Sequence, residues 1–324
     1  MRKILLIYGG PSGEHEVSLK SADMISRNLD VSKYDVYKVL IHKDETWQFL
    51  PDDKKLDLGQ AISHISAEHF DAAAFIAVHG LFGEDGRLQA LLEGIHLPYT
   101  GSSSSVSAIA MDKSASNLVY ASAGLMVSSF VTLNITDKLY KIETLKFPVI
   151  VKPLRGGSSI GLSKVENKDG IKSALDEGFK HDENVIIQEF VKGREITCGV
   201  LEDQNGMPFA LPPTEIISAE GGLFDYKAKY VSGASKEITP PGLAADKIKE
   251  VQDLAVRAHR VLGCSGISRS DFILKDDSWY ILETNTIPGM TETSLIPQEA
   301  KAAGISPSEL LDIVIASALR NHGK

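Results

Sequence analysis

The chain has 324 residues and a formal net charge of -9 at neutral pH. This length allows about two or three domains with a large buried core. The acidic balance argues against nucleic acid or an anionic membrane as the main partner, although a small basic pocket can still bind an anion. The two cysteines, Cys198 and Cys264, are far apart and lack metal-ligand spacing, which predicts structural thiols in a reducing compartment.

The chain begins with basic residues and a short apolar run that ends at the pair Gly9 and Gly10. Although this order superficially resembles a signal peptide, the run is too short, and it predicts a buried first strand over residues 3–8. Since no later stretch has the unbroken apolar length of a membrane span, we expect a cytoplasmic protein.

Residues 9–18 form a glycine-containing turn between this strand and a helical pattern. Such a turn presents backbone N-H groups at a helix start, which suits a carboxylate or a phosphate. The spacing of Gly9, Gly10 and Gly13 does not match the dinucleotide fingerprint G-x-G-x-x-G. Glu14 either acts on a ligand or simply helps to cap the helix.

Further strands are expected over residues 34–41 and 71–78, with a polar connection at 47–56 between them and a helix over 87–93. The alternation of strands and helices predicts a parallel sheet whose strand ends form the ligand edge. The loop after the third strand places His79 at this edge, beside the glycine turn. His79 is then either a ligand group or a structural histidine with satisfied hydrogen bonds.

The composition changes at residues 98–105, where a serine run follows a proline and a glycine. We place the first domain boundary there and expect a first domain over residues 1–102. A single helix through Met111, Leu118 and Tyr120 is expected to follow.

The next strong strand, residues 148–153, runs into a glycine and serine loop at 154–161, and a second strand returns over 162–165. Such a loop can fold over phosphates by offering backbone N-H groups and hydroxyls. It lacks the Walker pattern G-x-x-x-x-G-K-[ST], and an ordinary hairpin turn is the alternative. Lys152 favours the phosphate interpretation, because a lysine that ends an apolar strand needs solvent or an anion.

Residues 185–195 join a strand to a loop and a further strand, and they predict a hinge where a flat apolar ligand meets exposed backbone groups. Residues 218–235 have no regular periodicity and contain glycines, aromatic residues and Lys229. This composition favours a mobile lid that excludes water from a reaction, although a plain surface loop is the alternative.

The stretch from Asp271 to Asn285 predicts a hairpin, with a polar turn at residues 275–278 between two apolar runs. If the turn has an odd number of residues, Asp271 and Glu283 lie opposite each other on one face, which Asn285 shares by strand alternation. Two carboxylates and an amide suit a hard divalent ion such as Mg²⁺. The alternative is a solvated hairpin edge with incidental acids.

Six short motifs occur in order along almost the whole chain: GGPSGEHEVSL, HGLFGEDG, PYTGS, KPLRGGSSIG, FDYKAKY and ETNTIPGMT. Together they resemble the ATP-grasp ligases, and in particular the D-alanine-D-alanine ligase family. The resemblance implies an α/β fold, with an N-terminal parallel-sheet domain followed by a two-part ATP-grasp fold whose antiparallel sheets enclose the nucleotide. We therefore expect domains over residues 1–102, 103–188 and 189–324, the last with the lid at 218–235.

The resemblance implies a reaction in two steps. D-alanine attacks the γ-phosphate of ATP to give D-alanyl phosphate and ADP, and the amine of a second D-alanine then displaces phosphate to give D-alanyl-D-alanine for peptidoglycan synthesis. It also implies two Mg²⁺ or Mn²⁺ ions and a homodimer, with neither nucleic acid nor a membrane as partner.

By match to the family motifs, the residues expected to bind ATP are Lys113, Lys152, Ser158, Ser159, Gln188, Glu189, Phe190, Val191 and Glu195. The lysines would hold the phosphates beneath the serine loop, and Glu195 would contact the ribose. The family usually has glutamate in place of Gln188 and often lysine or glutamine in place of Glu189. An amide can still accept a hydrogen bond from the adenine amino group, so Gln188 changes the expected strength of this contact but not the choice of nucleotide.

The metal ligands implied by the resemblance are Asp271, Glu283 and Asn285. Arg269, two residues before Asp271 on the same face of the strand, would steady the transferring phosphoryl group and then the tetrahedral oxyanion. The backbone N-H of Gly289 would share this second task.

The residues expected to bind and activate the two D-alanine molecules are Glu14, His79, Ser158, Lys229, Tyr230, Ser294 and Leu295. Glu14 would hold the first ammonium group, and His79 the region of its carboxylate. Ser294 and Leu295, at a helix start, would hold the second carboxylate together with Lys229. Tyr230 would link the lid to Ser158 and Glu14 and make the acceptor an amine rather than a hydroxyl.

Two rival functions stay open. One is a nucleotide-binding sensor that has kept the fold and lost turnover, but it would lack a metal ligand or Arg269, and the sequence retains both. The other is a ligase that accepts D-lactate or D-serine, which only the lid and the acceptor pocket can discriminate.

Overall fold

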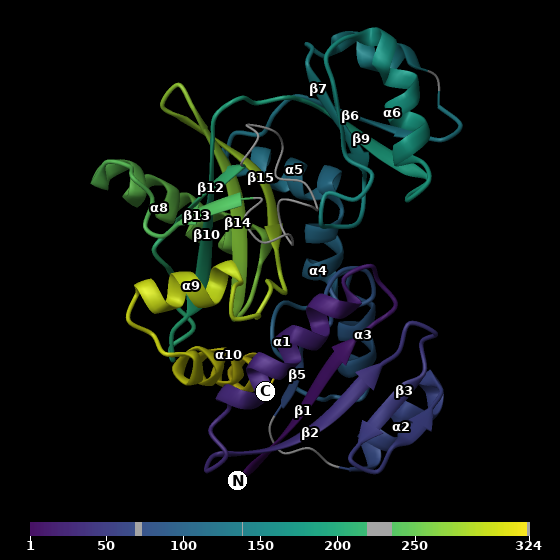
Figure 1. Cartoon of the computed structure of the whole chain (residues 1–324), viewed down its shortest axis with the longest axis vertical. Coiled ribbons are helices and arrows are strands. Elements are labelled where there is room, and N and C mark those ends of the chain that lie inside the picture. Colours follow the sequence, from purple (N-terminus) through teal and green to yellow (C-terminus); the bar gives the residue numbers. More distant parts are fainter. Residues whose placement is uncertain (69–72, 138, 219–234, 323–324) are drawn as a thin grey trace.

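The computed structural model describes residues 1–68, 73–137, 139–218 and 235–322. Within these residues the chain forms three sheets, each with its own helices (Figure 1). The predicted fold class is confirmed, since the first sheet is built on parallel strands and the other two sheets are antiparallel. The domain limits expected from the sequence stay predictions.

The N-terminal sheet has, in spatial order, β4 (Lys54–Leu56), β3 (Trp47–Leu50), β2 (Tyr34–Ile41), β1 (Arg2–Gly9) and β5 (Ala73–Ile76). Strand β1 is parallel to both of its neighbours. Its four central residues, all apolar, are fully buried, as expected for a parallel strand covered on both faces.

The expectation that residues 47–56 form a polar connection is wrong. These residues form the β3 and β4 hairpin, which pairs antiparallel with β2 at the sheet edge. Trp47 is only 1% exposed and belongs to the apolar core, so burial of its large ring holds this segment on the sheet despite the polar residues around it.

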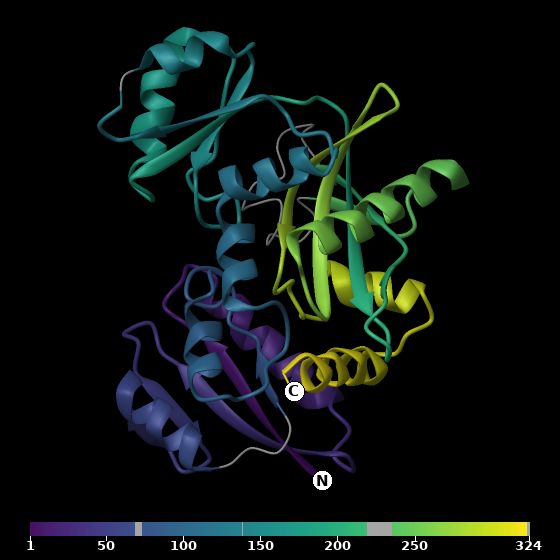
Figure 2. The same cartoon turned by 180° about the vertical axis from the view of Figure 1, so that it is seen from behind.

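Helices cover both faces of the N-terminal sheet. One face packs against α1 (His15–Asn28) and α10 (Pro307–His322), and the other against α2 (Leu58–Ala67) and α3 (Arg87–Gly94). The C-terminal helix thus returns to the first sheet, as both views show (Figure 2). In the described part of the chain no single helix is long and apolar enough to cross a membrane; α9 (Leu295–Ala302) and α10 meet the criteria of length and composition only as a pair, bent by 107°.

The single helix expected around residue 112 is two helices, α4 (Ser104–Met111) and α5 (Lys113–Ser122). Asp112 separates them because its carboxylate accepts hydrogen bonds from the backbone N-H groups of Ser114 and Ala115, both at 3.1 Å. This capping starts a new helix and places Lys113 at its first turn.

The central sheet has the order β6 (Phe130–Asn134), β9 (Asn184–Glu189), β7 (Val149–Pro153) and β8 (Ser163–Val165). Helix α6 (Ile171–Gly178) packs on it and closes a separate apolar core, with short 3-10 turns at Leu139–Thr144 and Lys168–Gly170. The expected glycine and serine loop connects β7 to β8.

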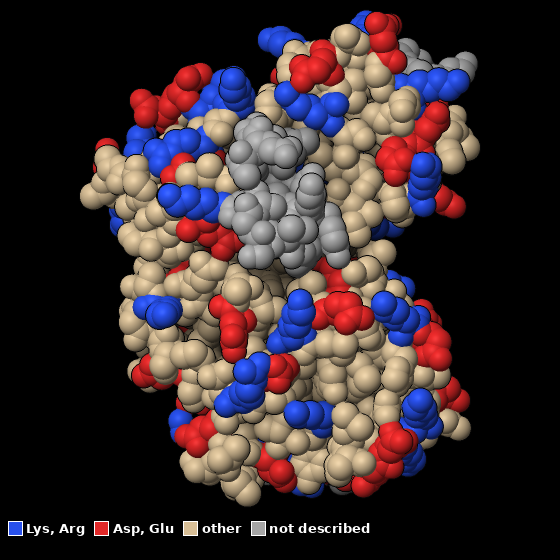
Figure 3. All heavy atoms as spheres, viewed as in Figure 1, with Lys and Arg blue, Asp and Glu red and all other residues tan. Residues whose placement is uncertain are grey.

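The third sheet has the order β13 (Ser235–Ile238), β12 (Thr214–Ser218), β10 (Arg194–Glu202), β14 (Ile267–Lys275) and β15 (Ser278–Asn285), with β11 (Pro208–Ala210) beside β10. Alternate residues of β10 face opposite sides: Cys198 packs toward α8 (Ala245–Leu262), whereas Leu201 packs toward α9 and α10. On the face of the molecule shown in Figure 3, the coloured basic and acidic side chains are interspersed.

Candidate active site

Two adjoining cavities, of about 310 and 680 Å³, share the walls formed by Lys113, Ser158 and Glu283. The smaller lies between the N-terminal and third sheets, and the larger between the central and third sheets. Every described residue that the sequence predicted for the site lines at least one of them. Lys229, Tyr230 and most of the expected lid, residues 219–234, lie outside the described residues.

The hairpin of β14 and β15 confirms that Asp271 lies opposite Glu283, and it also pairs Arg269 with Asn285. The turn does not have the odd number of residues on which this pairing was predicted. It consists of Asp276 and Asp277, with φ of 45° and 62°. The register instead shifts by one residue beside Asp271, so a bulge supplies the odd residue and turns Glu283 toward Asp271.

Arg269 and Asp271 form a two-pronged ion pair, in which Nε and Nη2 each donate to one carboxylate oxygen at 3.0 Å. Thr197 on β10 also donates to Asp271, at 2.6 Å. Burial lowers the pKa of Arg269, but the charge and hydrogen bonds of Asp271 outweigh this and raise it above its ordinary value. Arg269 therefore stays a fixed cation in the wall of the smaller cavity, close to the residues that the two cavities share.

The oxygen atoms of Asp271, Glu283 and Asn285 could bind a divalent ion, but they are too few to complete its coordination shell. Water or a ligand would have to supply the remaining oxygens. No group of three or more histidine, cysteine or acidic residues able to hold a metal occurs in the described ranges. Asp271 and Glu283 are paired across the strands, and the amide oxygen of Asn285 is oriented by the backbone N-H of Ile287 at 2.9 Å. Two carboxylates and one amide match Mg²⁺, which takes few protein ligands and completes its shell with water and phosphate.

The loop between β7 and β8 lies over both cavities and is attached to neighbouring elements. Lys113 Nζ donates to the carbonyl of Gly156 at 2.7 Å, and the sulfur of Met111 accepts from the Gly156 N-H at 3.2 Å. Ser158 and Ser159 have left-handed φ angles of 54° and 57°, a conformation that residues other than glycine seldom adopt.

Glu14 precedes the first residue of α1 but makes no side-chain capping hydrogen bond, so the helix-cap alternative is wrong. Its backbone N-H donates to Ser12 Oγ at 3.1 Å, and Ser12 in turn donates to the carbonyl of His79 at 2.6 Å. The Glu14 carboxylate accepts a short hydrogen bond from Ser158. The structure thus joins the glycine turn to the loop of the central sheet across the smaller cavity.

His79 is buried and has defined partners on both ring nitrogens. Nδ1 lies 3.2 Å from the carbonyl of Ile287, which can only accept, and Nε2 lies 2.8 Å from Ser21 Oγ. The Nδ1 atom must carry a proton to donate to the Ile287 carbonyl, whereas the Ser21 hydroxyl can either donate to Nε2 or accept from it. Burial and the charge of Glu14 raise the pKa of the adjacent Glu84, while its hydrogen bond to His79 acts in the opposite direction. Ser21 and Glu84 were not predicted from the sequence.

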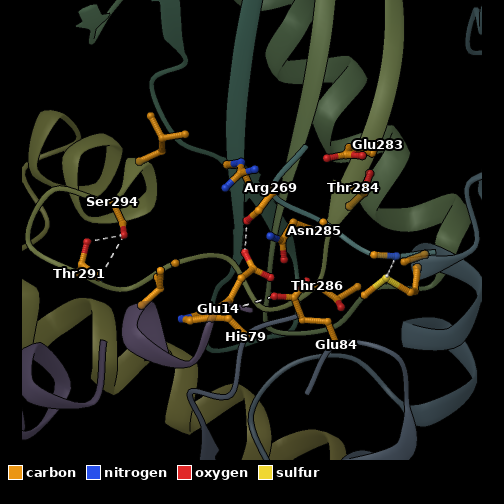
Figure 4. A pocket seen from close by; sticks show the side chains of 18 of the residues that line it. Glu14, His79, Glu84, Arg269, Glu283, Thr284, Asn285, Thr286, Thr291 and Ser294 are labelled. Atoms are coloured by element: carbon orange, nitrogen blue, oxygen red, sulfur yellow. Dashed lines mark hydrogen bonds and ion pairs between the residues drawn. The ribbon is translucent and has the colours of Figure 1, made fainter. Parts of the chain in front are cut away.

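Ser294 precedes α9 and makes no side-chain cap to that helix. Its hydroxyl instead accepts from the Thr291 N-H at 3.0 Å and pairs with the Thr291 hydroxyl at 2.7 Å. Gly289 is needed beside it, because a Cβ there would lie 2.8 Å from Ser294 Oγ. In Figure 4 Ser294 and Thr291 lie to one side, apart from Glu14 and His79, and Arg269 and Asn285 lie above those two residues.

The far end of the larger cavity is formed by the predicted hinge. Gln188 is buried near the end of β9, an inner strand of the central sheet, and the backbone N-H of Phe190 donates to the Pro148 carbonyl at 2.9 Å. The Glu189 carboxylate accepts from the backbone N-H of Lys146 at 2.9 Å, so it is partly engaged by the protein. Lys164 lies over the Phe190 ring, 4.5 Å from its centre.

Comparison with known families agrees with this geometry. Residues 3–102 match the family described as D-ala D-ala ligase N-terminus, and residues 119–316 match D-ala D-ala ligase C-terminus. The chain belongs to the D-alanine-D-alanine ligase family. It is 41% identical to the D-alanine-D-alanine ligase of Leptospira interrogans, over 99% of both chains, and 42% identical to that of Syntrophobacter fumaroxidans, over 98% of both.

Solved structures of the family share the fold. The D-alanine-D-alanine ligase from Bacillus anthracis complexed with ATP superposes with a TM-score of 0.83 at 31% identity, covering 100% of this chain and 99% of that one. The VanG D-Ala:D-Ser ligase from Enterococcus faecalis has a TM-score of 0.84 at 30% identity, covering 98% and 99%. Both an ATP complex and a ligase with a different acceptor therefore occur among the structural relatives.

Proposed function

We propose that this chain is an ATP-dependent ligase that joins two D-alanine molecules into D-alanyl-D-alanine, the dipeptide that its family makes for peptidoglycan synthesis. The observation that carries the proposal is the pair of adjoining cavities that meet at Lys113, Ser158 and Glu283. A nucleotide in one cavity and an amino acid in the other would bring a phosphate and a carboxylate together at this junction.

ATP would occupy the larger cavity. Lys113 and Lys152 lie where they could neutralise its phosphates, and the strained serine loop offers backbone N-H groups above them. The adenine would lie against the hinge from Gln188 to Val191, and Glu195 at the start of β10 would accept hydrogen bonds from the ribose.

Asp271, Glu283 and Asn285 would hold divalent ions, Mg²⁺ or Mn²⁺, whose positive charge favours phosphoryl transfer. The chain itself contributes the fixed cation of Arg269, which can bridge two phosphate oxygens through its planar fork. In the second step the same fork and the N-H of Gly289 would stabilise the oxyanion of the tetrahedral intermediate.

The first D-alanine would bind in the smaller cavity, with its ammonium at Glu14 and its carboxylate toward His79 and Arg269. A carboxylate oxygen attacks the γ-phosphorus, and the bond from that phosphorus to ADP breaks. The amine of the second D-alanine then attacks the acyl carbon, the bond to phosphate breaks, and the nitrogen releases a proton.

The carboxylate of the second D-alanine would bind at the start of α9, where the first backbone N-H groups and the Ser294 corner are available. Leu295 begins this helix. The predicted contributions of Lys229 and Tyr230 belong to the segment outside the described residues. We further infer a cytoplasmic location and a homodimeric assembly, and sedimentation of the purified protein tests the assembly.

Product analysis tests the proposed function. Purified protein is incubated with ATP, Mg²⁺ and D-alanine, and separately with D-alanine plus D-serine or D-lactate, with L-alanine as control. We expect equal amounts of ADP, phosphate and D-alanyl-D-alanine from D-alanine alone. ADP formation without dipeptide contradicts the proposal, and D-alanyl-D-serine formed in preference to the dipeptide favours the D-serine activity of the VanG relative.

A further inference from the structure

The Gly289 segment, residues 287–290, follows β15 and carries the backbone N-H group that is proposed to stabilise the oxyanion. Gly289 lines the smaller cavity, and its N-H makes no hydrogen bond to any described residue. Such a donor is effective when it already points at the place where the charge develops. The residues that fix the direction of this N-H group therefore matter for the second step of the reaction.

Two side chains from the N-terminal sheet and its helix α1 contact this segment on either side of Gly289. Ser21 of α1 is fully buried, and its Oγ accepts a hydrogen bond from the backbone N-H of Met290 at 3.3 Å. The same oxygen lies 2.8 Å from His79 Nε2, and His79 Nδ1 lies 3.2 Å from the carbonyl of Ile287. Ser21 and His79 thus hold both ends of the segment and are joined to each other.

The planarity of peptide units makes these contacts a constraint on the Gly289 N-H. The carbonyl of Ile287 belongs to the peptide unit just before the one that contains this N-H, and the N-H of Met290 belongs to the unit just after it. Glycine has no Cβ, so its own dihedral angles restrict the rotation of these units less than any other residue would. Hydrogen bonds to the two flanking units therefore limit the direction of the unit between them.

The hydrogen-bonding capacity of Ser21 fits this role. One lone pair of its hydroxyl accepts from Met290, and its only other partner among the described residues is His79 Nε2. With the His79 ring neutral and its proton on Nδ1, each donor in the chain has an acceptor: the Met290 N-H, the Ser21 hydroxyl and the His79 ring. An alanine at position 21 would leave the Met290 N-H and His79 Nε2 without this partner.

Apolar packing offers a simpler explanation of the same contacts. Ile287 and Met290 are 6% and 5% exposed, and their side chains belong to the apolar cores on opposite faces of the N-terminal sheet. If this packing alone fixed the segment, Ser21 would only satisfy a buried N-H. Side-chain packing does not, however, determine how the peptide units beside a glycine are rotated. The two explanations predict different effects on the two steps of the reaction.

We infer that Ser21 is a positioning residue, which acts with His79 to direct the N-H of Gly289 toward the oxyanion of the tetrahedral intermediate. The inference rests on the proposed function, in which this N-H serves the attack of the second D-alanine. Phosphoryl transfer to the first D-alanine does not use the Gly289 N-H. Loss of the Ser21 hydroxyl should therefore slow the second step selectively.

The test compares the two steps in Ser21→Ala. A labelled oxygen placed in the bridge between the β- and γ-phosphates of ATP scrambles within ATP whenever phosphoryl transfer reverses before ligation. At saturating D-alanine we expect the ratio of this exchange to dipeptide formation to rise about tenfold, the effect of one lost hydrogen bond in the second transition state. The KM for ATP and for the second D-alanine should be unchanged. A wild-type ratio overturns the inference, because a purely structural defect lowers both rates together.

The matched control is Ser26→Ala in the same helix. The Ser26 hydroxyl donates to the carbonyl of Ala22 at 2.7 Å, within α1, and this variant should keep the wild-type ratio. The wild-type protein separates the two possible failures. If it forms no dipeptide, the proposed function fails; if it does and Ser21→Ala keeps its ratio, only the inference fails.

Ser21→Cys keeps the packing of the buried position while replacing the hydroxyl by a thiol, a weak donor and acceptor. We expect the ratio to rise in this variant as well, and the ratio does not depend on how much of the protein is folded. A wild-type ratio in Ser21→Cys contradicts the inference even if Ser21→Ala does not fold.

A double-mutant cycle tests whether Ser21 acts together with His79. In the His79→Ala background the far end of the segment is already released, so Ser21→Ala should raise the ratio by less than it does in the wild-type background. The same fractional rise in both backgrounds overturns the joint role.

Discussion

Acidic residues in and beside the third sheet have the same functional group but different partners. Asp271 and Glu283 face each other across β14 and β15, whereas Glu299 of α9 is fully buried and accepts a hydrogen bond from the backbone N-H of Gly199. Asp271 is engaged by Arg269 and Thr197. Acidic residues within one small region therefore differ in their partners: a ligand, a cationic side chain of the protein, or the backbone.

Among these acidic residues, we expect the charge of Glu283 to matter most for turnover. Glu283→Gln should keep the fold but lower kcat by at least about a hundredfold, because one carboxylate fewer leaves the metal-bound phosphates poorly neutralised. Steady-state kinetics at saturating Mg²⁺ check this, with Glu309→Gln as control. Turnover within a few-fold of wild type would remove Glu283 from the metal site.

Glu299 should make folding stability depend on pH. Its pKa is raised by burial from an ordinary value of 4.5 to about 8, so the folded state binds its proton more tightly than the unfolded state does. The stabilisation is complete below pH 4.5 and is lost as the pH rises through 8. Glu299→Gln does not titrate, so its melting temperature should rise relative to wild type across this window. A difference that is constant with pH contradicts the expectation.

At the scale of elements, the face that carries the proposed metal ligands Asp271, Glu283 and Asn285 depends on the register of one hairpin. The alternation of apolar and polar residues predicts which side chains share a face, and Asp271, Glu283 and Asn285 were found in this way. The two-residue turn alone would not pair Asp271 with Glu283, and the bulge restores the pairing. No residue in the strand signals that bulge, so its place could not be predicted from the sequence.

The turn of this hairpin is not optimal for its backbone. Asp276 and Asp277 both have positive φ, a conformation that favours glycine at the second position of a two-residue turn. We expect Asp277→Gly to raise the free energy of unfolding by about 0.5–1 kcal/mol. The same substitution within α6, Asp176→Gly, should instead lower it by about 0.3 kcal/mol. Urea unfolding of both variants measures this contrast, and destabilisation by Asp277→Gly contradicts it.

The sequence of helix α9 contains a signal, a buried acidic residue, that could have been predicted from its pattern of apolar residues. Leu295, Ile296 and Ala300 lie on its buried face, and Glu299 interrupts that apolar stripe at helical spacing. An acid in such a stripe is rarely left buried without a role, so it is a readable signal. Ser21 and Glu84 gave no comparable signal, because their importance depends on contacts with His79, to which they come from different elements.

At the scale of the whole molecule, the sequence predicts the parallel sheet and the glycine and serine loop between β7 and β8 because both depend on local pattern. It does not predict that α10 completes the core of the N-terminal sheet. That contact joins segments at opposite ends of the described chain, and the apolar stripe of a helix does not specify its partner. The β3 and β4 hairpin was missed for a related reason, since burial of Trp47 outweighs its polar surroundings.

The packing of α10 against the first sheet should contribute a large part of the free energy of unfolding. Leu311 is fully buried in the core that α1, β1 and α10 share, so Leu311→Ala should lower the free energy of unfolding by about 2–5 kcal/mol through lost burial and a cavity. Leu118→Ala, at a position 64% exposed, is the matched control and should change little. Denaturant unfolding measures both, and equal small effects would show that α10 contributes little to this core.

The return of α10 to the first sheet also affects the order in which the protein can fold during its synthesis. Strand β1 and helix α1 leave the ribosome early, but the apolar face that they share with α10 has its full cover only after residues 307–322 have emerged. Until then the nascent chain presents an uncovered apolar surface to chaperones and to other nascent chains. Ribosome-bound chains stalled before Pro307 should therefore bind ribosome-associated chaperones more strongly than chains carrying a C-terminal linker long enough for residues 307–322 to emerge.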